Sequence, residues 1–213
     1  MKNLQKTLQE AESEQRRLAE LVIEKDDANS DYKTVTGVDV SYRGTAAFAC
    51  AVVYDLSTMK PVKSLALRLE SKLPYIPNYF YLKEGPILID LLEQFPDTGP
   101  VLIDGNGILH PRRFGLASYV GVKIDRPTIG IAKGLLTGKL GERDGDSAPI
   151  LDSGEIIGKA VWLNNTAKPV FVSIGHRVSL ERAIQISRQS TIRSYPEPLK
   201  LAHRCSKSNN QWN

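Results

Sequence analysis

The sequence predicts an α/β protein whose sheet contains both antiparallel and parallel strand pairs. Three strand-like segments at 34–42, 46–56 and 61–70 are joined by short turns, which is typical of an antiparallel meander. Apolar runs at 100–104 and 127–132 flank a helical pattern, and this β-α-β order implies a parallel pair. A chain of 213 residues is the expected size of one domain with a substantial core.

The N-terminal segment 2–25 predicts a surface helix. Its apolar residues recur at three- and four-residue steps among many charged ones. They are Leu4, Leu8, Ala11, Leu18, Leu21 and Val22. We expect the apolar side of this helix to pack on the sheet, and no side chain of the segment suggests chemistry.

The second half of the chain predicts a loop, a hairpin and two helices. Residues 137–154 are polar and rich in glycine, which favours a long exposed loop. Segments 156–163 and 168–176 have the residue pattern of a strand hairpin. Helices are expected at 179–190 and at 199–207.

Composition argues against membrane and secreted classes of protein. Hydrophobic residues make up 41% of the chain and charged residues 24%, which is ordinary for a globular protein. No run approaches the ~20 apolar residues of a membrane span, and the N-terminus has no apolar signal segment. Cys50 and Cys205 lie far apart in the sequence and form no CxxC pair. We therefore expect reduced cysteines and a cytoplasmic location.

The net charge of +4 is concentrated near the C-terminus. The segment from Arg177 to the end has seven basic and two acidic residues, so the rest of the chain is close to neutral. A basic segment suits a polyanionic partner, and a solvated helix face is the alternative interpretation.

The segment 101–133 gathers residue types that suit phosphate and metal chemistry. An apolar run ends at Asp104, and Gly105 and Gly107 follow in a tight turn that lets backbone approach a ligand closely. His110 comes next, and a second apolar run leads to Lys133. Such groups collect in loops at strand ends of open α/β sheets. The alternative interpretation is a surface loop with incidental charges.

Two further acids join Asp104 as candidate metal ligands. Asp39 lies inside a strand pattern, where a buried acid needs a partner, although a solvent-facing position on an edge strand is the alternative. Glu84 opens a predicted helix, where an acid is also favourable to the helix dipole. With His203 on the last helix, these residues form an oxygen-rich ligand set that suits Mg²⁺ or Mn²⁺. The residues alone are consistent with metal-dependent hydrolysis of phosphodiesters.

Several motifs resemble the endonuclease V family and follow one another in that family's order. They are TGVDVSY, PYIPNYFYLKEGP, VLIDGNGILHPRRFGLASYVGV, IGIAK and VSIGHRVSL. The block DGNGILHPRRFGLA is highly specific. The resemblance implies an RNase H-like fold with a mixed β-sheet flanked by α-helices. It also implies a single endonuclease V domain over 1–213, with an N-terminal helix within 1–30 and a catalytic core at 34–205.

The resemblance also implies an activity. Members of the family are metal-dependent endonucleases of the deoxyribonuclease V type, so we expect a Mg²⁺ enzyme in which Mn²⁺ can substitute. It would recognise inosine, the product of adenine deamination, and cut the second phosphodiester bond 3′ of it. The products would carry 3′-hydroxyl and 5′-phosphate ends. The expected role is DNA repair on inosine-containing DNA, with RNA as the alternative substrate and with no membrane or obligate protein partner.

By motif, the resemblance assigns each candidate residue a role. The implied catalytic residues are Asp39, Glu84, Asp104, His110 and Lys133. The implied metal ligands are Asp39, Glu84, Asp104 and His203. The implied base-recognition residues are Tyr75, Pro77, Gly105 and Gly107, with Tyr75 as a wedge that fills the gap left by the modified base. For His110, a structural role at a helix start is the alternative interpretation.

The chain departs from the family pattern at two positions. Asn78 replaces a glycine, and Asn tolerates a left-handed backbone best after glycine, so the turn can survive. Lys83 replaces an arginine, which retains the charge but loses the bidentate fork. The metal-binding acids are intact, so the departures concern strand handling and substrate preference.

Three other classes of protein compete with this hypothesis. A non-catalytic nucleic-acid-binding protein on the same fold would have lost a metal-binding acid, and none is lost. A DNA glycosylase for deaminated bases needs no metal and leaves an abasic site, so EDTA sensitivity separates it. A structural or protein-interaction domain predicts no buried cluster of acids.

Overall fold

The structure is a computed structural model that describes residues 2–27, 31–71, 76–96 and 99–208. Within these residues one nine-stranded sheet has the strand order β3-β2-β1-β4-β5-β9-β8-β7-β6. The strands are β1 (Thr34–Arg43), β2 (Ala46–Asp55), β3 (Lys60–Glu70), β4 (Val101–Asp104), β5 (Thr128–Ala132), β6 (Lys139–Leu140), β7 (Ser147–Asp152), β8 (Glu155–Val161) and β9 (Val170–His176). The sheet is mixed, as expected, because β1, β4 and β5 pair in parallel whereas the other pairs are antiparallel.

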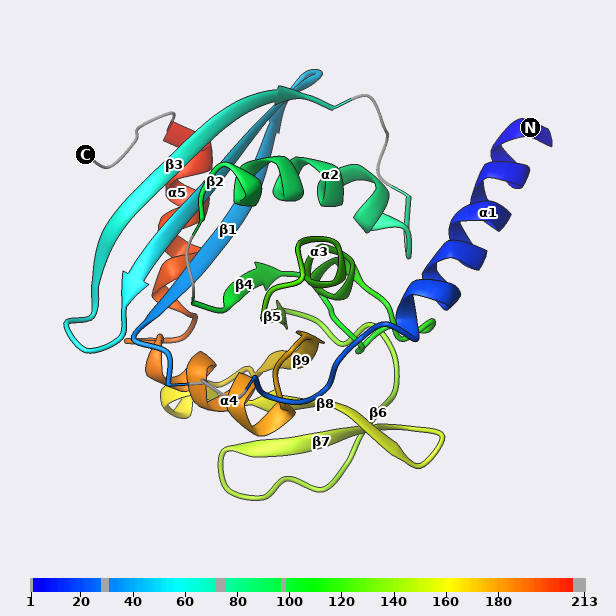
Figure 1. Ribbon diagram of the computed structural model, residues 1–213. Helices are drawn as coiled ribbons and strands as arrows, with labels where there is room; N and C mark the ends of the chain where they lie inside the picture. Colours follow the sequence, from blue (N-terminus) through cyan, green and yellow to red (C-terminus); the bar gives the residue numbers. More distant parts are fainter. Residues whose placement is uncertain (1, 28–30, 72–75, 97–98, 209–213) are drawn as a thin grey trace.

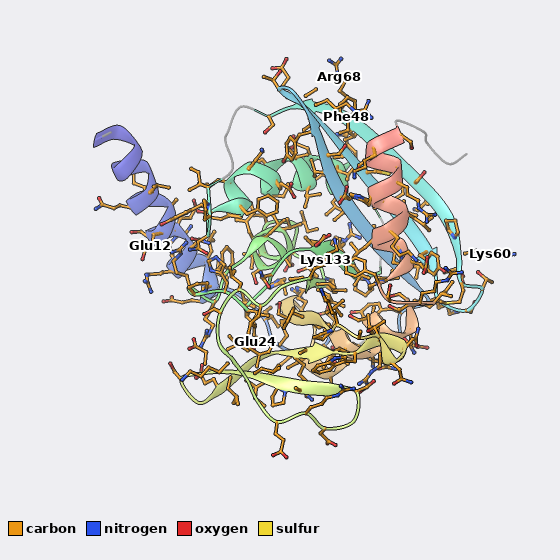
Figure 2. The ribbon with its side chains drawn as sticks, turned by 180° about the vertical axis from the view of Figure 1, so that it is seen from behind. Glu12, Glu24, Phe48, Lys60, Arg68 and Lys133 are labelled. Carbon is orange, nitrogen blue, oxygen red and sulfur yellow. A yellow bond between two sulfur atoms is a disulfide. The ribbon has the colours of Figure 1, made fainter. Side chains whose placement is uncertain are left out.

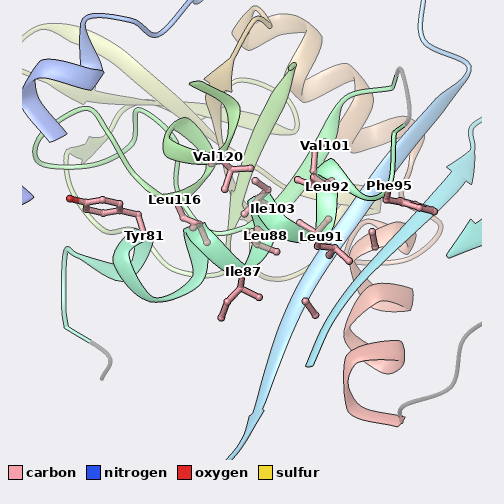
Figure 3. Packing of buried hydrophobic residues seen from close by; sticks show 14 of the residues in the cluster. Tyr81, Ile87, Leu88, Leu91, Leu92, Phe95, Val101, Ile103, Leu116 and Val120 are labelled. Atoms are coloured by element: carbon pink, nitrogen blue, oxygen red, sulfur yellow. The ribbon is translucent and has the colours of Figure 1, made fainter. Parts of the chain in front are cut away.

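Helices cover both faces of this sheet (Figure 1). They are α1 (Lys2–Ala19), α2 (Phe80–Glu93), α3 (Leu116–Ile124), α4 (Leu180–Gln189) and α5 (Glu197–Ser208), with a 3-10 turn η1 (Leu163–Asn165) before β9. Helices α2 and α3 pack on one face of β1 and β4, where Ile87, Leu91 and Ile103 share one core (Figure 3). Helices α4 and α5 pack on the opposite face, around Leu102 and Leu199. Alternation along each strand sends neighbouring residues to these two cores.

The polar segment 137–154 is not the exposed loop that its composition predicts. It forms β6 and β7, and Ala148 and Ile150 on β7 are fully buried. The turn into β8 uses Ser153 and Gly154, both at positive φ, as the common two-residue hairpin requires. The segment has few apolar residues, but Ala148 and Ile150 alternate with others along the chain, which gives the strand one buried face.

Helix α1 is shorter than predicted, and within the described residues it packs chiefly on helices and not directly on the sheet. It ends at Ala19, because the following backbone bonds the end of β9: the N–H of Ile23 donates to His176 Nδ1, and its carbonyl accepts from the N–H of Arg177. The buried side of α1 contacts the helix layer instead, and the Tyr81 hydroxyl of α2 donates to the Ala11 carbonyl at 3.0 Å.

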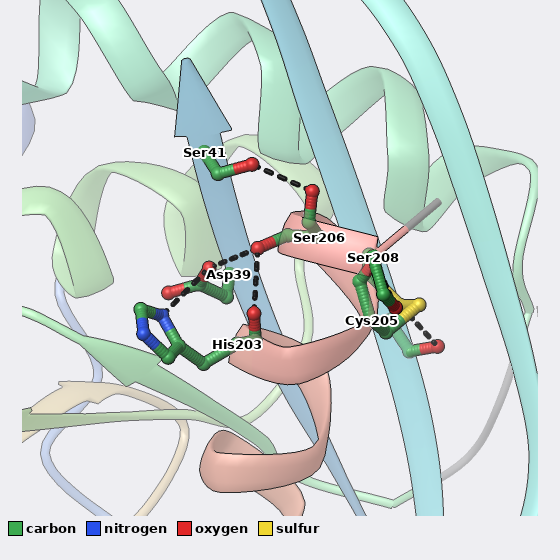
Figure 4. The surroundings of a disulfide bond; sticks show 8 residues. Asp39, Ser41, His203, Cys205, Ser206 and Ser208 are labelled. Atoms are coloured by element: carbon green, nitrogen blue, oxygen red, sulfur yellow. Dashed lines mark hydrogen bonds and ion pairs between the residues drawn. A yellow bond between two sulfur atoms is a disulfide. The ribbon is translucent and has the colours of Figure 1, made fainter. Parts of the chain in front are cut away.

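The prediction of two reduced cysteines was wrong. Cys50 of β2 and Cys205 of α5 form a disulfide across 155 residues of sequence, with their Cα atoms 6.0 Å apart (Figure 4). Sequence distance concealed the pair, because α5 returns to lie across β1 and β2. Gly37 permits this contact, since a Cβ there would come within 2.3 Å of the Pro198 backbone.

Candidate active site

Asp39 and Asp104 are brought together by the parallel pairing of β1 and β4. The register pairs Gly37 with Leu102 and Val38 with Ile103, so the next residue along each strand is Asp39 or Asp104. β4 ends at Asp104, whereas β1 continues to Arg43. The two acids therefore lie where one strand stops beside another that continues, which leaves their carboxylates room for a ligand.

Helix α5 supplies two partners for Asp39 (Figure 4). The Ser206 hydroxyl donates to Asp39 Oδ2 at 2.6 Å, and His203 Nδ1 lies 3.3 Å from the same oxygen. His203 and Ser206 are three residues apart and so share one face of the helix. The end of α5 is also fixed to β1, because the Ser41 hydroxyl donates to the Ser206 carbonyl at 2.6 Å. His203 thus lies beside Asp39, and its role as a metal ligand stays a prediction.

Glu84 reaches the same place from the other face of the sheet. It is only 9% exposed, and it lies in the second turn of α2 because the helix begins at Phe80, not at Glu84 as predicted. Burial, and next the charge of Asp39, raise the pKa of Glu84 to about 8, and the charge of Asp104 acts in the same direction. An acid that merely favoured a helix dipole would not face two other carboxylates.

These three carboxylates fit a divalent cation by their chemistry. Burial, and then the charges of Asp39 and Asp104, disfavour the ionised form of Glu84, and a cation between the three carboxylates would offset this. In the part of the chain that the structure describes, no three His, Cys, Asp or Glu side chains already form a group ready to hold a metal ion. Hydrogen bonds and ion pairs to neighbouring side chains occupy carboxylate oxygens of Asp39 and Asp104 instead.

Lys133 is the positive group at this site. It follows β5 and, seen from behind, lies near the centre of the molecule (Figure 2). Its ammonium is 2.5 Å from Asp104 Oδ2 and 4.8 Å from the centre of the Tyr195 ring. Burial, together with the charge of Asp104, raises the pKa of Tyr195 above its usual range, so this hydroxyl is neutral. Tyr195 and Lys133 thus flank Asp104.

A cavity of about 290 Å³ lies past the end of β4, where Gly105 follows Asp104. It is lined by Gln15, Asn78, Phe80, Tyr81, Gly105, Asn106, His110, Gly115, Leu116 and Leu136. Its volume is at the low end for small-molecule pockets, and most of its lining is apolar or uncharged. The cavity therefore suits a small neutral ring better than a charged group.

Of the predicted base-recognition residues, some line this cavity and others lie away from it. Gly105 lines it directly, next to Asn106. Gly107 does not line it but packs on β9, where its N–H donates to the Ser173 hydroxyl and a Cβ would overlap the Ile174 carbonyl. Pro77 is exposed in the turn before α2. Tyr75 lies outside the described residues.

His110 belongs to the cavity wall and is 4% exposed. Its Nδ1 accepts a hydrogen bond from the N–H of Arg112 at 3.2 Å. Burial, and then the positive charge of Arg112, lower the pKa of His110 to about 4, so its ring is neutral at pH 7. The structure thus places it among uncharged cavity residues, and it does not start a helix, because α3 begins at Leu116.

The two departures from the family pattern have clear structural settings. Asn78 has a φ of 65°, so the left-handed turn that favours glycine is retained, as expected. The Lys83 ammonium lies 4.0 Å from the centre of the Tyr42 ring. Burial, and then the charge of the neighbouring Glu84, raise the pKa of Tyr42, so the Tyr42 hydroxyl lies within reach of the Glu84 carboxylate. Lys83 thus extends along the side of the acid site.

Three residues at these sites were not predicted from the sequence: Ser206, Gln15 and Tyr195. Ser206 carried a usable signal, because it lies one helical turn after His203. Gln15 carried another, since it is a polar residue in the apolar stripe between Ala11 and Leu18 and is fully buried. Tyr195 carried none, because an aromatic residue before a proline in a loop has many possible surroundings.

The basic C-terminal segment is partly neutralised by ion pairs. Arg177 is 2.8 Å from Asp27 and 2.7 Å from Asp125, and Arg188 is 2.5 Å from Asp146. These pairs leave less free positive charge than the sequence count suggests, and the predicted contact with a polyanion stays a prediction. Within the described residues, no helix is both long and apolar enough to cross a membrane.

Comparison with known proteins identifies the family. The family description Endonuclease V matches residues 16–204. The chain is 41% identical over 202 residues to an endonuclease V of Thermofilum pendens, covering 92% of this chain and 86% of that relative. It belongs to the endonuclease V family. Accordingly it is a nuclease, a hydrolase that acts on phosphodiester bonds, and the family resemblance of the sequence motifs is confirmed.

Solved structures agree in fold. The Ciona intestinalis endonuclease V, solved with a 24mer DNA containing an inosine followed by a ribo-adenosine, is 30% identical. It superimposes with a TM-score of 0.87 over 96% of this chain and 98% of its own. Endonuclease V from Streptomyces avermitilis is 34% identical, with a TM-score of 0.85 over 94% and 92% of the two chains. The expected mixed sheet flanked by helices is thereby confirmed.

Proposed function

We propose that this nuclease recognises inosine in nucleic acid and hydrolyses the second phosphodiester bond 3′ of it, leaving 3′-hydroxyl and 5′-phosphate ends. The observation that carries the proposal is the meeting of Asp39, Glu84 and Asp104 beside a small uncharged cavity. The acids suit phosphodiester chemistry, and the cavity suits a base taken out of its stack. Residues 1–213 would act as one domain, with the core at 34–205.

The cofactor of the proposal is Mg²⁺, with Mn²⁺ as a substitute, held by Asp39, Glu84, Asp104 and His203. When bound, it supplies positive charge to the scissile phosphate and makes a water molecule more acidic. Ser206 orients Asp39 through its 2.6 Å hydrogen bond, so that the carboxylate keeps a free edge toward the substrate.

Lys133 is the residue that we propose to contact the phosphate. Its side chain is 66% exposed, and its ammonium forms a short ion pair with Asp104. Phosphate oxygens compete with Asp104 for this ammonium, so substrate would pull Lys133 toward the scissile bond and offset charge there. His110, neutral and buried, would instead shape the cavity wall.

The cavity is proposed to take the hypoxanthine base. Gly105 lets the backbone approach the ring, and the Asn106 side-chain oxygen is buried with no hydrogen-bond partner in the described part of the chain. Hypoxanthine carries an N–H at N1, whereas adenine has a bare acceptor there, so an unpaired oxygen favours the deaminated base. Pro77 and Gly107 would fix the surrounding turns, and Tyr75 would fill the gap in the stack.

The proposed substrate is inosine-containing DNA, in a role in DNA repair in the cytoplasm, and RNA is the alternative substrate. The Ciona intestinalis relative has been solved with inosine-containing DNA, which supports the first choice. A glycosylase acting on the same base is the competing enzyme class, and the acid site argues against it because a glycosylase has no use for clustered metal-binding carboxylates.

The test uses end-labelled single strands of DNA and RNA with one inosine at a fixed position. With Mg²⁺ we expect one cut, at the second bond 3′ of inosine, with ends that ligase and phosphatase identify as 3′-hydroxyl and 5′-phosphate. EDTA should stop the reaction, and the matched adenine strand should stay intact. An abasic product without a strand break, or equal cutting of the adenine strand, would contradict the proposal.

A further inference from the structure

The N-terminal helix reaches into the proposed base pocket through one side chain. Gln15 of α1 is fully buried and lines the cavity. Its side-chain Nε2 donates to the Phe114 carbonyl at 2.8 Å, across 99 residues of sequence. This bond fixes α1 to the segment that leads into α3, and it orients the amide so that the side-chain oxygen faces the other way.

The amide oxygen of Gln15 orients an arginine. Arg112 Nε donates to Gln15 Oε1 at 2.6 Å. The same guanidinium donates from Nη2 to the Asn78 carbonyl at 2.8 Å and lies 4.5 Å above the centre of the Tyr79 ring. Arg112 therefore holds the segment before α2 at two points, while Gln15 fixes the direction of its planar fork.

Asn78 is the end of this chain of contacts and part of the cavity wall. Its φ of 65° lies in the left-handed region, which costs asparagine less than most residues but more than glycine, so contacts to this turn help to hold it. Its carbonyl accepts a hydrogen bond from Arg112 at 2.8 Å and a longer one from Gln15 Nε2 at 3.5 Å. If Gln15 is lost, Arg112 Nε and the Phe114 carbonyl both lose a buried partner, and the guanidinium is free to turn away from Asn78.

We infer that Gln15 is a positioning residue for base selection: through Arg112 it fixes the Asn78 wall of the pocket and so sets how well the protein distinguishes a 6-oxopurine from adenine. The inference rests on the proposed function. It assigns the N-terminal helix a role in specificity and none in the hydrolytic step, because α1 contributes no group to the acid site among the contacts described above.

The test compares Gln15→Met with Gln9→Met, which makes the same change at an exposed position of the same helix. Binding of labelled single-stranded DNA with inosine or adenine at one position is measured by fluorescence anisotropy in EDTA. We expect Gln15→Met to lower the inosine-over-adenine affinity ratio about tenfold, as small misplacements in a site do. Gln9→Met should leave the ratio unchanged, and adenine-strand binding should be the same in all variants.

Arg112→Met tests the same inference with a second substitution, because it removes the side chain that connects Gln15 to Asn78 and changes no residue of α1. It should lower the ratio to a similar extent, and the double variant should lose no more than either single one, as expected for residues in one network. Gln15→Glu retains the acceptor for Arg112 and should recover part of the ratio.

Folding is checked by the thermal unfolding midpoint of each variant. If Gln15→Met does not fold, Arg112→Met carries the test alone. A wild-type ratio in a folded Gln15→Met or Arg112→Met variant overturns the inference, as does an equal loss of affinity for both strands. A wild-type protein without preference for inosine overturns the proposed function itself, and the inference with it.

Discussion

The first and last helices of the chain support different halves of the site in different ways. Helix α5 is fastened by a disulfide, by hydrogen bonds to Asp39 and Ser41, and by the close approach at Gly37. Helix α1 reaches its half mainly through the buried amide of Gln15 and the Tyr81–Ala11 hydrogen bond. The first half holds opposed negative charges, and the second is an uncharged cavity.

The two halves need different kinds of support. Carboxylates that repel one another must be held firmly, because relaxation of the backbone would separate them and lower the energy. A neutral cavity needs less restraint, but its wall must be accurately placed to choose between similar bases. A disulfide therefore adds to the noncovalent contacts at the charged half, whereas hydrogen bonds alone, chiefly those of Gln15, hold α1 at the neutral half.

The largest expected effect comes from the charged half. Asp39→Asn and Asp104→Asn should each nearly abolish cleavage in Mg²⁺, because each removes ligand charge with almost no change in side-chain size. Inosine-strand binding should fall much less. Single-turnover cleavage and anisotropy on the same preparations separate the two quantities. Full activity of either variant would remove that residue from the proposed metal site.

The next effect concerns the fastening of α5. Cys50→Ala with Cys205→Ala should lower the free energy of unfolding by about 4–5 kcal/mol, since the disulfide closes 155 residues of chain. Denaturant unfolding measures this loss. Reduction of the wild-type protein should reproduce it, and reduction of the double variant should change nothing. Equal stability of oxidised and reduced protein would show that the noncovalent contacts of α5 are sufficient.

The smallest expected effect concerns the stability contributed by His110, in the wall of the neutral cavity. His110 has a folded-state pKa of about 4 against an ordinary value near 6.5, so the unfolded chain binds the proton more tightly. Its contribution to stability is therefore full above pH 6.5 and is lost as the pH falls toward 4, by roughly 3 kcal/mol. Unfolding free energies across this range should fall less steeply in His110→Asn. Parallel pH profiles would contradict a buried neutral ring.

Much of the fold followed from local patterns. The meander and the β-α-β unit were predictable because alternation and helical periodicity express burial directly. β7 was missed because its two buried residues, Ala148 and Ile150, stand among glycines and charges. The start of α2 was predicted one turn too late, at Glu84, since nothing in the sequence shows that the helix begins at Phe80, soon after the left-handed turn at Asn78.

Site residues could be predicted from the sequence only where they lie in the motifs that resemble the family. Asp104 was a candidate because it ends an apolar run, Asp39 because it is an acid inside a strand pattern, and the family resemblance assigned roles to both and to His203. The disulfide and the Gln15–Arg112–Asn78 contacts join segments between 34 and 155 residues apart. Such contacts depend on how helices return to the sheet, and no spacing in one sequence encodes that.

The order of the sheet leaves β3 and β6 as its two edges within the described residues, and each edge discourages pairing with another molecule. β3 is long, but Lys60, Pro61 and Lys63 lie near its start, and the pairing with β2 has an irregular register beside them. β6 has only two residues. Lysine, proline, irregular register and short length all hinder the growth of a sheet across molecules. These features lower the tendency of the open sheet to add a strand from a second copy of the protein at either edge.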